Sequence, residues 1–421
     1  MYNWAYMKVF KILGRLIWIT IAIGAVAVTT CVALVSLYGT NVKIIKGEED
    51  TTPEVVREPE IASAQMRVLF AGTTFWGRRT NTDARASELG VKYPFSQLDT
   101  LDRASYDAWI GGLECPVTDN GHNKTEEETI FKFNCDPDYL PEAAKYFTAF
   151  LLGNNHAGNQ GKAGLATTRN YLAQNGIQYF GTPKRTASDT SDPEYANDDE
   201  DINNCDIVVL PVRISLDDGS EDKYQIPFGF CSAHGVYGVP GEDYLQNMKT
   251  FAQYVPTIAM PHMGAEYKTS HDTIRQNLYR KMIDYGVEAV IGDHPHWLQD
   301  AEAYRDKLIV YSMGNFMFDQ TFNAEVVRSA AIEANAVIEI EGADLQAWNE
   351  LGEQCLADKA TCFEKITEAG LTKLSISWTY DYHGTTSAGN RITRLASESE
   401  QAAIGERLNW NAIPASLKVS K

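Results

Sequence analysis

The 421-residue sequence has little positive charge, with 37 Lys and Arg against 56 Asp and Glu and a formal net charge of −19. A nucleic-acid-binding domain needs a basic face, so the sequence argues against that class of partner. It also contains no internal repeat and no P-loop or Rossmann glycine pattern, which excludes the best-known nucleotide-binding signatures. Its composition of 44% hydrophobic and 22% charged residues is typical of a folded globular protein.

Cysteine is scarce, and no CxxC or Cys/His spacing indicates a zinc knuckle. One cysteine, Cys31, lies in a long apolar segment. The remaining six are Cys115, Cys135, Cys205, Cys231, Cys355 and Cys362. An even number in an exported domain predicts disulfides, although six cysteines permit 15 pairings. Cys355 and Cys362 form the easiest local pair, and Cys205 and Cys231 can pair across strands predicted at 206–212 and 225–230.

Residues 16–38 contain no charged residue. As a helix with a rise of about 1.5 Å per residue, they would span roughly 34 Å, enough to cross a bilayer with some tilt. Trp18 and Tyr38 lie near the two ends, where such side chains favour the membrane interface. The alternative is a cleaved signal peptide. The apolar region of a signal peptide is usually about 7–15 residues long and is followed by a small-x-small cleavage site. The segment here is longer, and no clean site of that kind precedes Lys43, so an uncleaved transmembrane helix is favoured.

The charges that flank this segment predict its orientation. Lys8, Lys11 and Arg15 precede it, whereas Lys43 and Lys46 and then an acidic stretch at residues 48–50 follow it, so the basic bias toward the N-terminal side is modest. Under the positive-inside rule the N-terminus is cytoplasmic and the rest of the chain lies outside the cytoplasm. The sequence therefore predicts a single-pass cell-membrane protein. Its parts are a cytoplasmic N-terminus (1–15), an anchor (16–38), an acidic linker (39–65), a main domain (66–398) and a C-terminal tail (399–421).

The main domain repeats one pattern, a short apolar run that is followed at once by small and polar residues. Such runs are typical of strands buried on both faces. They cover 68–71, 108–110, 150–152, 258–260, 289–291 and 308–311. Helices are predicted between several of them, at 168–174 and at 272–284, where Ile274, Leu278 and Met282 form one apolar stripe. Strands that alternate with helices indicate the α/β class.

Residues 186–204 are acidic and predict a solvated surface loop, with calcium capture as the lesser alternative. Further on, a helical segment is predicted at 343–371 and a late strand at 374–380.

Polar side chains with metal-binding chemistry follow these predicted strands. They are Glu114, Asn155, His156, His262, His294 and His296. Ligands bind beyond the carboxyl ends of strands in α/β sheets, so the pattern predicts one site. The chain has only eight histidines. A single histidine such as His156 is often a surface or core residue, but the set as a whole favours metal ligation. Mixed imidazole, carboxylate and amide ligands favour Zn²⁺, Mn²⁺ or Fe²⁺ over Ca²⁺.

In these segments the sequence resembles the CapA family of poly-γ-glutamate capsule biosynthesis proteins, a branch of the calcineurin-like metallophosphatases. The resemblance runs from about Arg67 to Asp319 and continues more weakly to about Leu395. The motifs that carry it occur in order: FAGTTFWGR (70–78), GLECPVTD (112–119), NNHAGNQG (154–161), PHMGAEY (261–267), GDHPHWLQ (292–299) and YSMGNFMFDQ (311–320).

The resemblance implies a layered α-β-β-α sandwich and one or two divalent ions, with Mg²⁺ added to the candidates. It makes His156 the proton donor or charge stabiliser. The implied metal ligands are Glu114, Asn155, His262, His294 and His296. Asn154 and Asn315 belong to matching motifs as supporting residues.

The sequence departs from the family pattern at three motif positions. Thr73 replaces the opening Asp, Gly112 replaces an Asn, and Asn159 replaces an Asp. A neutral hydroxyl is a poorer ligand for a divalent ion than a carboxylate is, so one strong and one weak metal position are expected, or no catalysis. Asp293, beside the histidine pair, is a candidate to compensate.

Three functions follow from these patterns. The first is an anchored protein of poly-γ-glutamate or similar envelope-polymer synthesis and export, with other membrane proteins of that machinery as partners. The second is a metal-dependent hydrolase of phosphoesters or another envelope substrate. The third is a scaffold of the same fold whose catalysis is impaired at Thr73. An acidic domain repels polyglutamate, so binding of that polymer requires a metal or a local basic patch.

The topology is directly testable. Protease added to intact cells or spheroplasts should remove residues 47–421 and leave the N-terminus protected, because only the uncharged segment crosses the membrane. An ectodomain that stays protected in spheroplasts would contradict this prediction.

Overall fold

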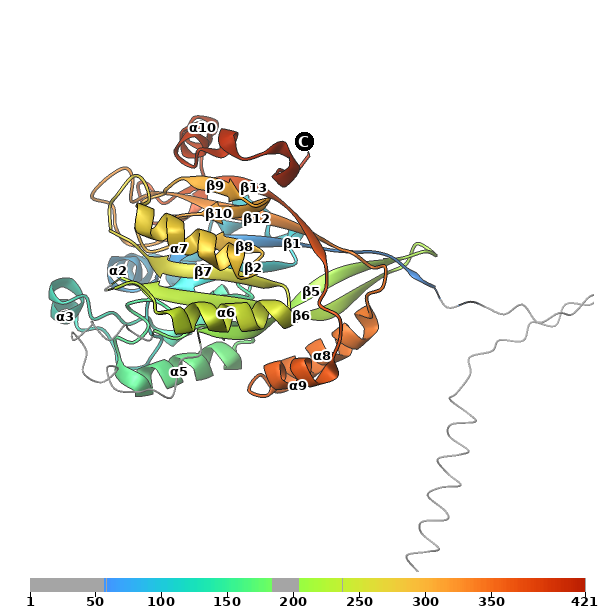
Figure 1. Ribbon diagram of the computed structural model, residues 1–421. Helices are drawn as coiled ribbons and strands as arrows, with labels where there is room; N and C mark the ends of the chain where they lie inside the picture. The colour runs from blue at the N-terminus through green and yellow to red at the C-terminus, as the bar shows by residue number, and fades with distance from the viewer. Residues whose placement is uncertain (1–56, 58, 184–203, 237, 421) are drawn as a thin grey trace, which may run out of the picture. The chain divides into compact units, whose positions relative to one another are not determined.

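The computed structural model describes residue 57 and residues 59–183, 204–236 and 238–420. The predicted anchor and the acidic loop at 186–204 therefore lie outside the described residues, apart from Asn204. No helix in the described ranges is long and apolar enough to cross a membrane. Residues from Glu60 onward form one compact unit (Figure 1).

All six apolar runs form strands, which confirms the α/β prediction. The strands are β1 (Ile61–Thr74), β2 (Ala108–Leu113), β3 (Ala149–Leu151), β4 (Gln178–Phe180), β5 (Cys205–Leu216), β6 (Glu221–Gly235), β7 (Thr257–Met263), β8 (Ala289–Ile291), β9 (Ala301–Tyr304), β10 (Lys307–Val310), β11 (Asn315–Met317), β12 (Arg328–Ile338), β13 (Ile376–Thr386) and β14 (Arg394–Leu395). Every residue of β2, β3, β7 and β8 is buried, as the uniformly apolar runs predict.

Helices occupy most of the longer connections. They are α2 (Arg78–Ala86), α3 (Lys124–Thr129), α4 (Leu140–Ala143), α5 (Gly161–Gln174), α6 (Glu242–Tyr254), α7 (Thr273–Asp284), α8 (Leu345–Ala357), α9 (Cys362–Ala369) and α10 (Glu398–Arg407). Residues after α10 continue in two short 3₁₀ turns, and Leu408, Trp410 and Leu417 are buried there. The C-terminal residues thus pack onto the domain.

Strand β1 joins two arms of a continuous hydrogen-bonded sheet. Its first half pairs with β5 and β12, both antiparallel, and its second half pairs in parallel with β2 and β11. One arm continues from β2 through β3 to β4, and the other runs from β5 through β6, β7, β8 and β10 to β9. Phe180 on β4 and Phe230 on β6 have ring centroids 5.1 Å apart, so the arms pack face to face. This arrangement fits the predicted layered sandwich.

Alternation along β1 separates two hydrophobic cores. Met66, Val68 and Phe70 point into the larger core, between the arms, whereas Leu69 and Ala71 point into a second core. Helix α5 contributes to the second core, and α6 and α7 cover the other arm beside β7 and β8 (Figure 1). Because successive strand residues face opposite sides, both faces of β1 are buried.

Helix α7 departs from its predicted stripe at one position. Leu278 and Met282 are buried as expected, but Ile274 is 60% exposed. The buried residue of that turn is Arg275, whose guanidinium donates to Asp272, the helix N-cap, and to Gln299. The prediction that Ile274 is buried is therefore wrong. The buried position belongs to Arg275, whose charge is balanced by its hydrogen-bond partners.

Three disulfides link the six cysteines of the described domain. Cys355–Cys362 and Cys205–Cys231 confirm the two predicted pairs, and Cys115–Cys135 uses the remaining two. Cys205 and Cys231 stand opposite each other in the register of β5 and β6. The predicted helical segment around Cys355 and Cys362 forms α8 and α9.

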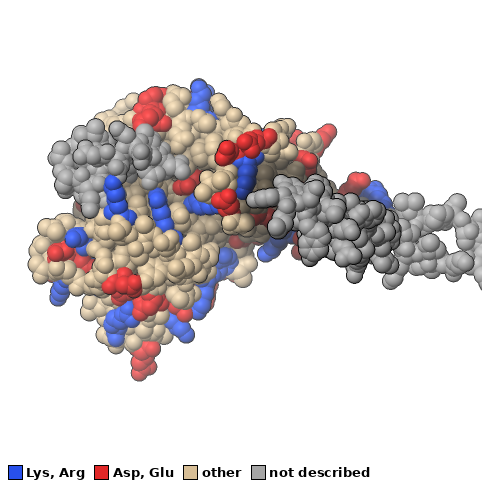
Figure 2. All heavy atoms as spheres, turned by 90° about the horizontal axis from the view of Figure 1, so that it is seen from below, with Lys and Arg blue, Asp and Glu red and all other residues tan. Residues whose placement is uncertain are grey.

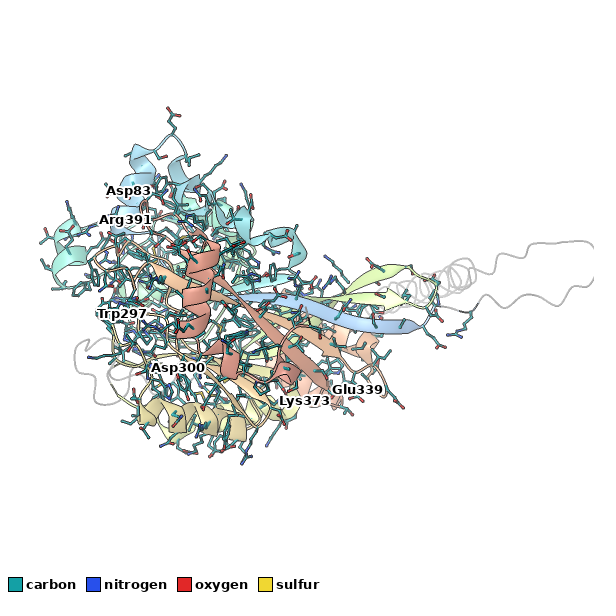
Figure 3. All side chains as sticks on the ribbon, turned by 90° about the horizontal axis from the view of Figure 1, so that it is seen from above. Asp83, Trp297, Asp300, Glu339, Lys373 and Arg391 are labelled. Atoms are coloured by element: carbon teal, nitrogen blue, oxygen red, sulfur yellow. A yellow bond between two sulfur atoms is a disulfide. The ribbon has the colours of Figure 1, made fainter. Side chains whose placement is uncertain are left out.

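Charges of both signs are interspersed on the face seen from below (Figure 2). An ion pair of 2.6 Å joins Arg391, before β14, to Asp83 on α2, and the two side chains lie together in Figure 3. Arg391 also donates to the carbonyl of Asp319. The segment before β14 therefore contacts the loop that follows β11.

Gly352 tests the packing of α8 on β6. A Cβ at this buried position would lie 1.7 Å from the backbone oxygen of Gln225. An Ala in a helix ordinarily stabilises it by roughly 0.5–1 kcal/mol relative to Gly, but here it must displace a strand. We expect Gly352→Ala to lower the free energy of unfolding by about 1–3 kcal/mol in urea denaturation. The exposed Glu353→Ala on the same helix serves as the control, and a Gly352→Ala variant as stable as the wild type would refute the packing.

Candidate metal centre

The candidate site lies where strands of both arms end. Glu114 follows β2, His156 follows β3, His262 lies in β7, and His294 and His296 follow β8. An isolated β-bridge between His262 and Asp293 extends the pairing of β7 past the end of β8. The parallel order of these strands brings their carboxyl ends to one edge, as expected for this class of sheet.

Glu114 lies at the centre of this site and is 1% exposed. Its Oε1 atom is 3.8 Å from the Nε2 of His156, 3.8 Å from that of His262 and 3.9 Å from that of His296. No donor among the described residues meets ordinary hydrogen-bond geometry with either oxygen. Burial, followed by the negative charge of Asp293, raises the pKa of Glu114 well above its usual value. A buried carboxylate in this position is stabilised by a cation.

His262 contacts both Asn155 and His294 beside Glu114. The Nε2 atom of His262 is 2.9 Å from the Oδ1 of Asn155 and 3.2 Å from the Nδ1 of His294. One ligand atom from each of Glu114, His262 and His294 falls within 4.8 Å of the others. Burial lowers the pKa of both imidazoles well below the usual value, so both are neutral and able to ligate. These donors and the orphaned carboxylate fit a divalent transition metal.

Amide side chains set the tautomers of His156 and His296. The Oδ1 of Asn159 accepts from the backbone N–H of Phe133 at 2.8 Å, so the same oxygen accepts from the Nδ1 of His156 at 2.9 Å. Asn315 donates its amide to the carbonyl of Val326, and its Oδ1 therefore accepts from the Nδ1 of His296 at 2.8 Å. In both rings the Nε2 lone pair faces Glu114, which is the usual second-sphere arrangement of a metal site.

The loop that carries the two adjacent histidines has a strained backbone. His294 has a φ of 96° and His296 a φ of 58°, a region that non-glycine residues rarely adopt. Such conformations persist where the surrounding structure enforces them and cluster at functional sites. Here the strain directs both imidazoles toward Glu114.

A pocket of about 710 Å³ opens beside the site and includes Asn155, His156 and His296 in its lining. Three cationic residues, Arg78, Lys132 and Lys162, line it together with one acid, Glu266. The aromatic side chains of Phe131, Phe133, Tyr267 and Phe318 complete much of its wall. The lining therefore holds more cationic than anionic side chains, although Arg78 pairs with Asp319 at 2.5 Å and Lys132 pairs with Glu126 at 3.4 Å.

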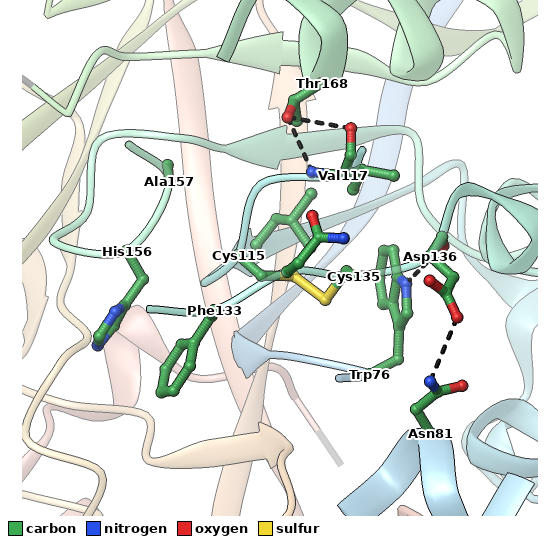
Figure 4. The surroundings of a disulfide bond; sticks show 12 residues. Trp76, Asn81, Cys115, Val117, Phe133, Cys135, Asp136, His156, Ala157 and Thr168 are labelled. Atoms are coloured by element: carbon green, nitrogen blue, oxygen red, sulfur yellow. Dashed lines mark hydrogen bonds between the residues drawn. A yellow bond between two sulfur atoms is a disulfide. The ribbon is translucent and has the colours of Figure 1, made fainter. Parts of the chain in front are cut away.

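The Cys115–Cys135 disulfide braces this pocket next to Glu114 (Figure 4). Cys115 follows Glu114 directly, and Cys135 lies two residues beyond Phe133. The ring of Phe133 stacks on His156 with centroids 4.1 Å apart. The disulfide thus connects the central carboxylate to the wall that holds His156.

Nine of the ten residues predicted from the sequence gather around this centre. Asn315 orients His296, and the Oγ1 of Thr73 donates to the carboxylate of Asp293. Asn154 does not face the cluster: it donates to the carbonyl of Leu113 and accepts from the backbone N–H groups of His156 and Ala157. Its role is to shape the loop after β3.

Sequence reasoning missed the basic wall of the pocket and the disulfide beside it. Arg78 closes the first motif, and Cys115 follows Glu114, so adjacency was a signal for both. Lys132 and Lys162 carry no such signal, because they reach the pocket only through the fold.

Comparison with known proteins places these features in one family. A family model described as "Bacterial capsule synthesis protein PGA_cap" matches residues 67–320. The PGA biosynthesis protein CapA of Bacillus subtilis (strain 168) is 26% identical over 274 residues, which cover 65% of this chain and 68% of that protein. The capsule biosynthesis protein CapA of Bacillus anthracis is 24% identical over 287 residues, covering 66% of this chain and 64% of its own length. GAP50 of Plasmodium aligns with 85% of this chain at 11% identity, but the TM-score of 0.33 is too low to relate the two structures.

The histidine pair provides the test of the metal centre. His294→Ala combined with His296→Ala removes two of the three proposed imidazole ligands, so stoichiometric binding of Mn²⁺ should be lost. Elemental analysis after dialysis measures the metal content, and His122→Ala, which removes an ion pair with the buried Glu127, is the control. A double variant that retains the wild-type metal content would show that the site is misassigned.

Proposed function

The chain belongs to the bacterial capsule synthesis proteins of the PGA_cap family, and from that premise we propose that it serves poly-γ-glutamate capsule biosynthesis as a metal-dependent hydrolase of the anionic polymer. The observation that carries this proposal is the basic pocket, which opens onto a buried cluster of one carboxylate and several neutral imidazoles.

The pocket suits a polyanion with apolar spacers. Each residue of poly-γ-glutamate carries one free carboxylate and two methylene groups in its backbone. The exposed Lys132 can exchange its ion pair with Glu126 for such a carboxylate, and Lys162 adds positive charge to the same wall. The exposed rims of Ile130 and Phe131 can cover the methylenes. A local basic surface of this kind attracts an anionic chain despite the acidic remainder of the domain.

The chemistry follows from the side chains at the pocket floor. A divalent metal at this site would polarise the carbonyl to be cleaved and lower the pKa of bound water. Glu114, Asn155, His262, His294 and His296 would hold it. His156 is 13% exposed and neutral, since burial lowers its pKa to about 3. With so low a pKa the ring is a weak base, and its Nε2 lone pair is placed to orient a nucleophile in the pocket by accepting a hydrogen bond.

We further propose that the domain works outside the cytoplasm, tethered by residues 16–38. Two observations support this placement. The segment is uncharged over its whole length, and the domain has three disulfides, which persist in oxidising compartments. Other membrane proteins of polymer synthesis and export would be its partners there.

The function can be tested on the full chain in detergent, loaded with Mn²⁺. We expect γ-linked glutamate oligomers to bind and to be cleaved, with new amino groups as the readout. The α-linked oligomers and a generic phosphodiester serve as comparison substrates. Lys132→Glu with Lys162→Glu should weaken binding about tenfold, because two exposed attractions become repulsions. Lys249→Glu with Lys365→Glu changes the net charge equally, outside the pocket.

Three results would count against this function. Cleavage of the phosphodiester alone would assign a phosphoesterase. Binding of the polymer without cleavage would assign a scaffold. Equal losses in both charge-reversal variants would show that net charge, and not the pocket, attracts the polymer.

A further inference from the structure

The carboxylate of Asp293, which follows β8, fills a space beside β1 and β2. Thr73 on β1 and Gly112 on β2 are neighbours in the strand register. Asp293 follows β8, on the other arm, and its carboxylate accepts from the Oγ1 of Thr73 at 2.9 Å to each oxygen. A Cβ on Gly112 would lie 2.9 Å from the Oδ2 of Asp293. The small side chains at 73 and 112 therefore leave room for this carboxylate.

The backbone of Asp293 is held as firmly as its side chain. Its N–H donates to the carbonyl of Pro261, and its own carbonyl accepts from the N–H of Met263. Both hydrogen bonds reach the segment of β7 that flanks His262. Asp293 is 1% exposed and directly precedes His294. It is thus positioned by the same two strands that supply the three proposed imidazole ligands.

Asp293 and Glu114 are held by adjacent residues of β1. The carboxylate of Asp293 accepts from Thr73, and the N–H of Glu114 donates to the carbonyl of Thr74 at 3.0 Å. Two buried carboxylates repel each other unless a cation lies near both. A threonine hydroxyl orients one of them but does not neutralise it.

We propose that Asp293 is a metal ligand that supplies, from the end of β8, the carboxylate that β1 lacks at Thr73. Thr73 is then a positioning residue, which orients Asp293 through its hydroxyl. This inference rests on the proposed metal centre and adds a ligand to it. The alternative is a protonated Asp293 that only bonds to Thr73 as part of the core.

The first experiment measures Mn²⁺ binding to the full-length protein by calorimetry and elemental analysis. Asp293→Asn keeps the shape and the hydrogen bond to Thr73 but removes the charge. We expect it to lose at least tenfold in affinity, or one of two bound ions. Thr73→Val keeps the carboxylate but frees its orientation, so the expected loss is severalfold. Asp300→Asn, in the ion pair with His271, is the matched control.

A carboxylate exchange provides the decisive comparison. Thr73→Asp alone would place two carboxylates within contact distance and should not increase the bound Mn²⁺. Thr73→Asp combined with Asp293→Ala should restore much of the binding that Asp293→Ala loses, because the charge returns to the same space. The electron paramagnetic resonance spectrum of the bound Mn²⁺ should change in Asp293→Asn and return toward the wild type in the exchange variant. Thermal unfolding of the metal-free variants identifies any that fail to fold.

The outcomes separate this inference from the function on which it rests. A wild-type protein that binds Mn²⁺, with an Asp293→Asn variant that binds equally well, would overturn the role of Asp293 and leave the metal centre intact. An increase in bound Mn²⁺ in Thr73→Asp alone would also overturn the role of Asp293, because it would show that Asp293 does not already act as a ligand in this space. A wild-type protein that binds no metal would overturn both proposals.

Discussion

The carboxylate of Glu114 is buried among imidazoles without a conventional hydrogen-bond donor, and the surrounding structure is arranged around this charge. In a low-dielectric interior an unpaired carboxylate is costly, and the same burial keeps the nearby histidines neutral. The protein alone cannot balance the charge of Glu114, because the neutral imidazoles around it carry no positive charge. A divalent cation would supply that charge, since it pairs with the carboxylate and accepts the imidazole lone pairs.

The sheet supplies this arrangement from two arms that meet at β1. Glu114 and His156 come from one arm, and His262, His294 and His296 come from the other. Their approach depends on the core between the arms, where rings such as Phe70 and Phe230 pack together. Metal binding and the packing of the arms should therefore stabilise each other.

The charge of the pocket lining differs from the net charge of the protein. A protein of net charge −19 would repel a polyanion on average, but Arg78, Lys132 and Lys162 line the pocket together with a single acid, Glu266. Electrostatic attraction at short range depends on the nearest charges, because salt screens those beyond about 10 Å. The Cys115–Cys135 disulfide keeps this basic wall in place against Glu114.

Local patterns in the sequence were enough to predict the α/β class, the six apolar strands and the group of residues at their ends. These features are local: an apolar run buried on both faces, followed by polar residues, has few other structural solutions. It also identified two disulfides, which the strand register and the short separation made plausible.

Only the tertiary structure decided which of these residues meet. Asn154 turned to the backbone of its own loop, and Arg275 replaced Ile274 in the core of α7. The contact of Asp293 with Thr73 joins residues 220 positions apart, and Lys132 and Lys162 reach the pocket through loops without any strand pattern. Such contacts depend on how the arms pack and on the direction of individual side chains. The periodicity of a sequence carries information about the face of an element and none about the partner across the core.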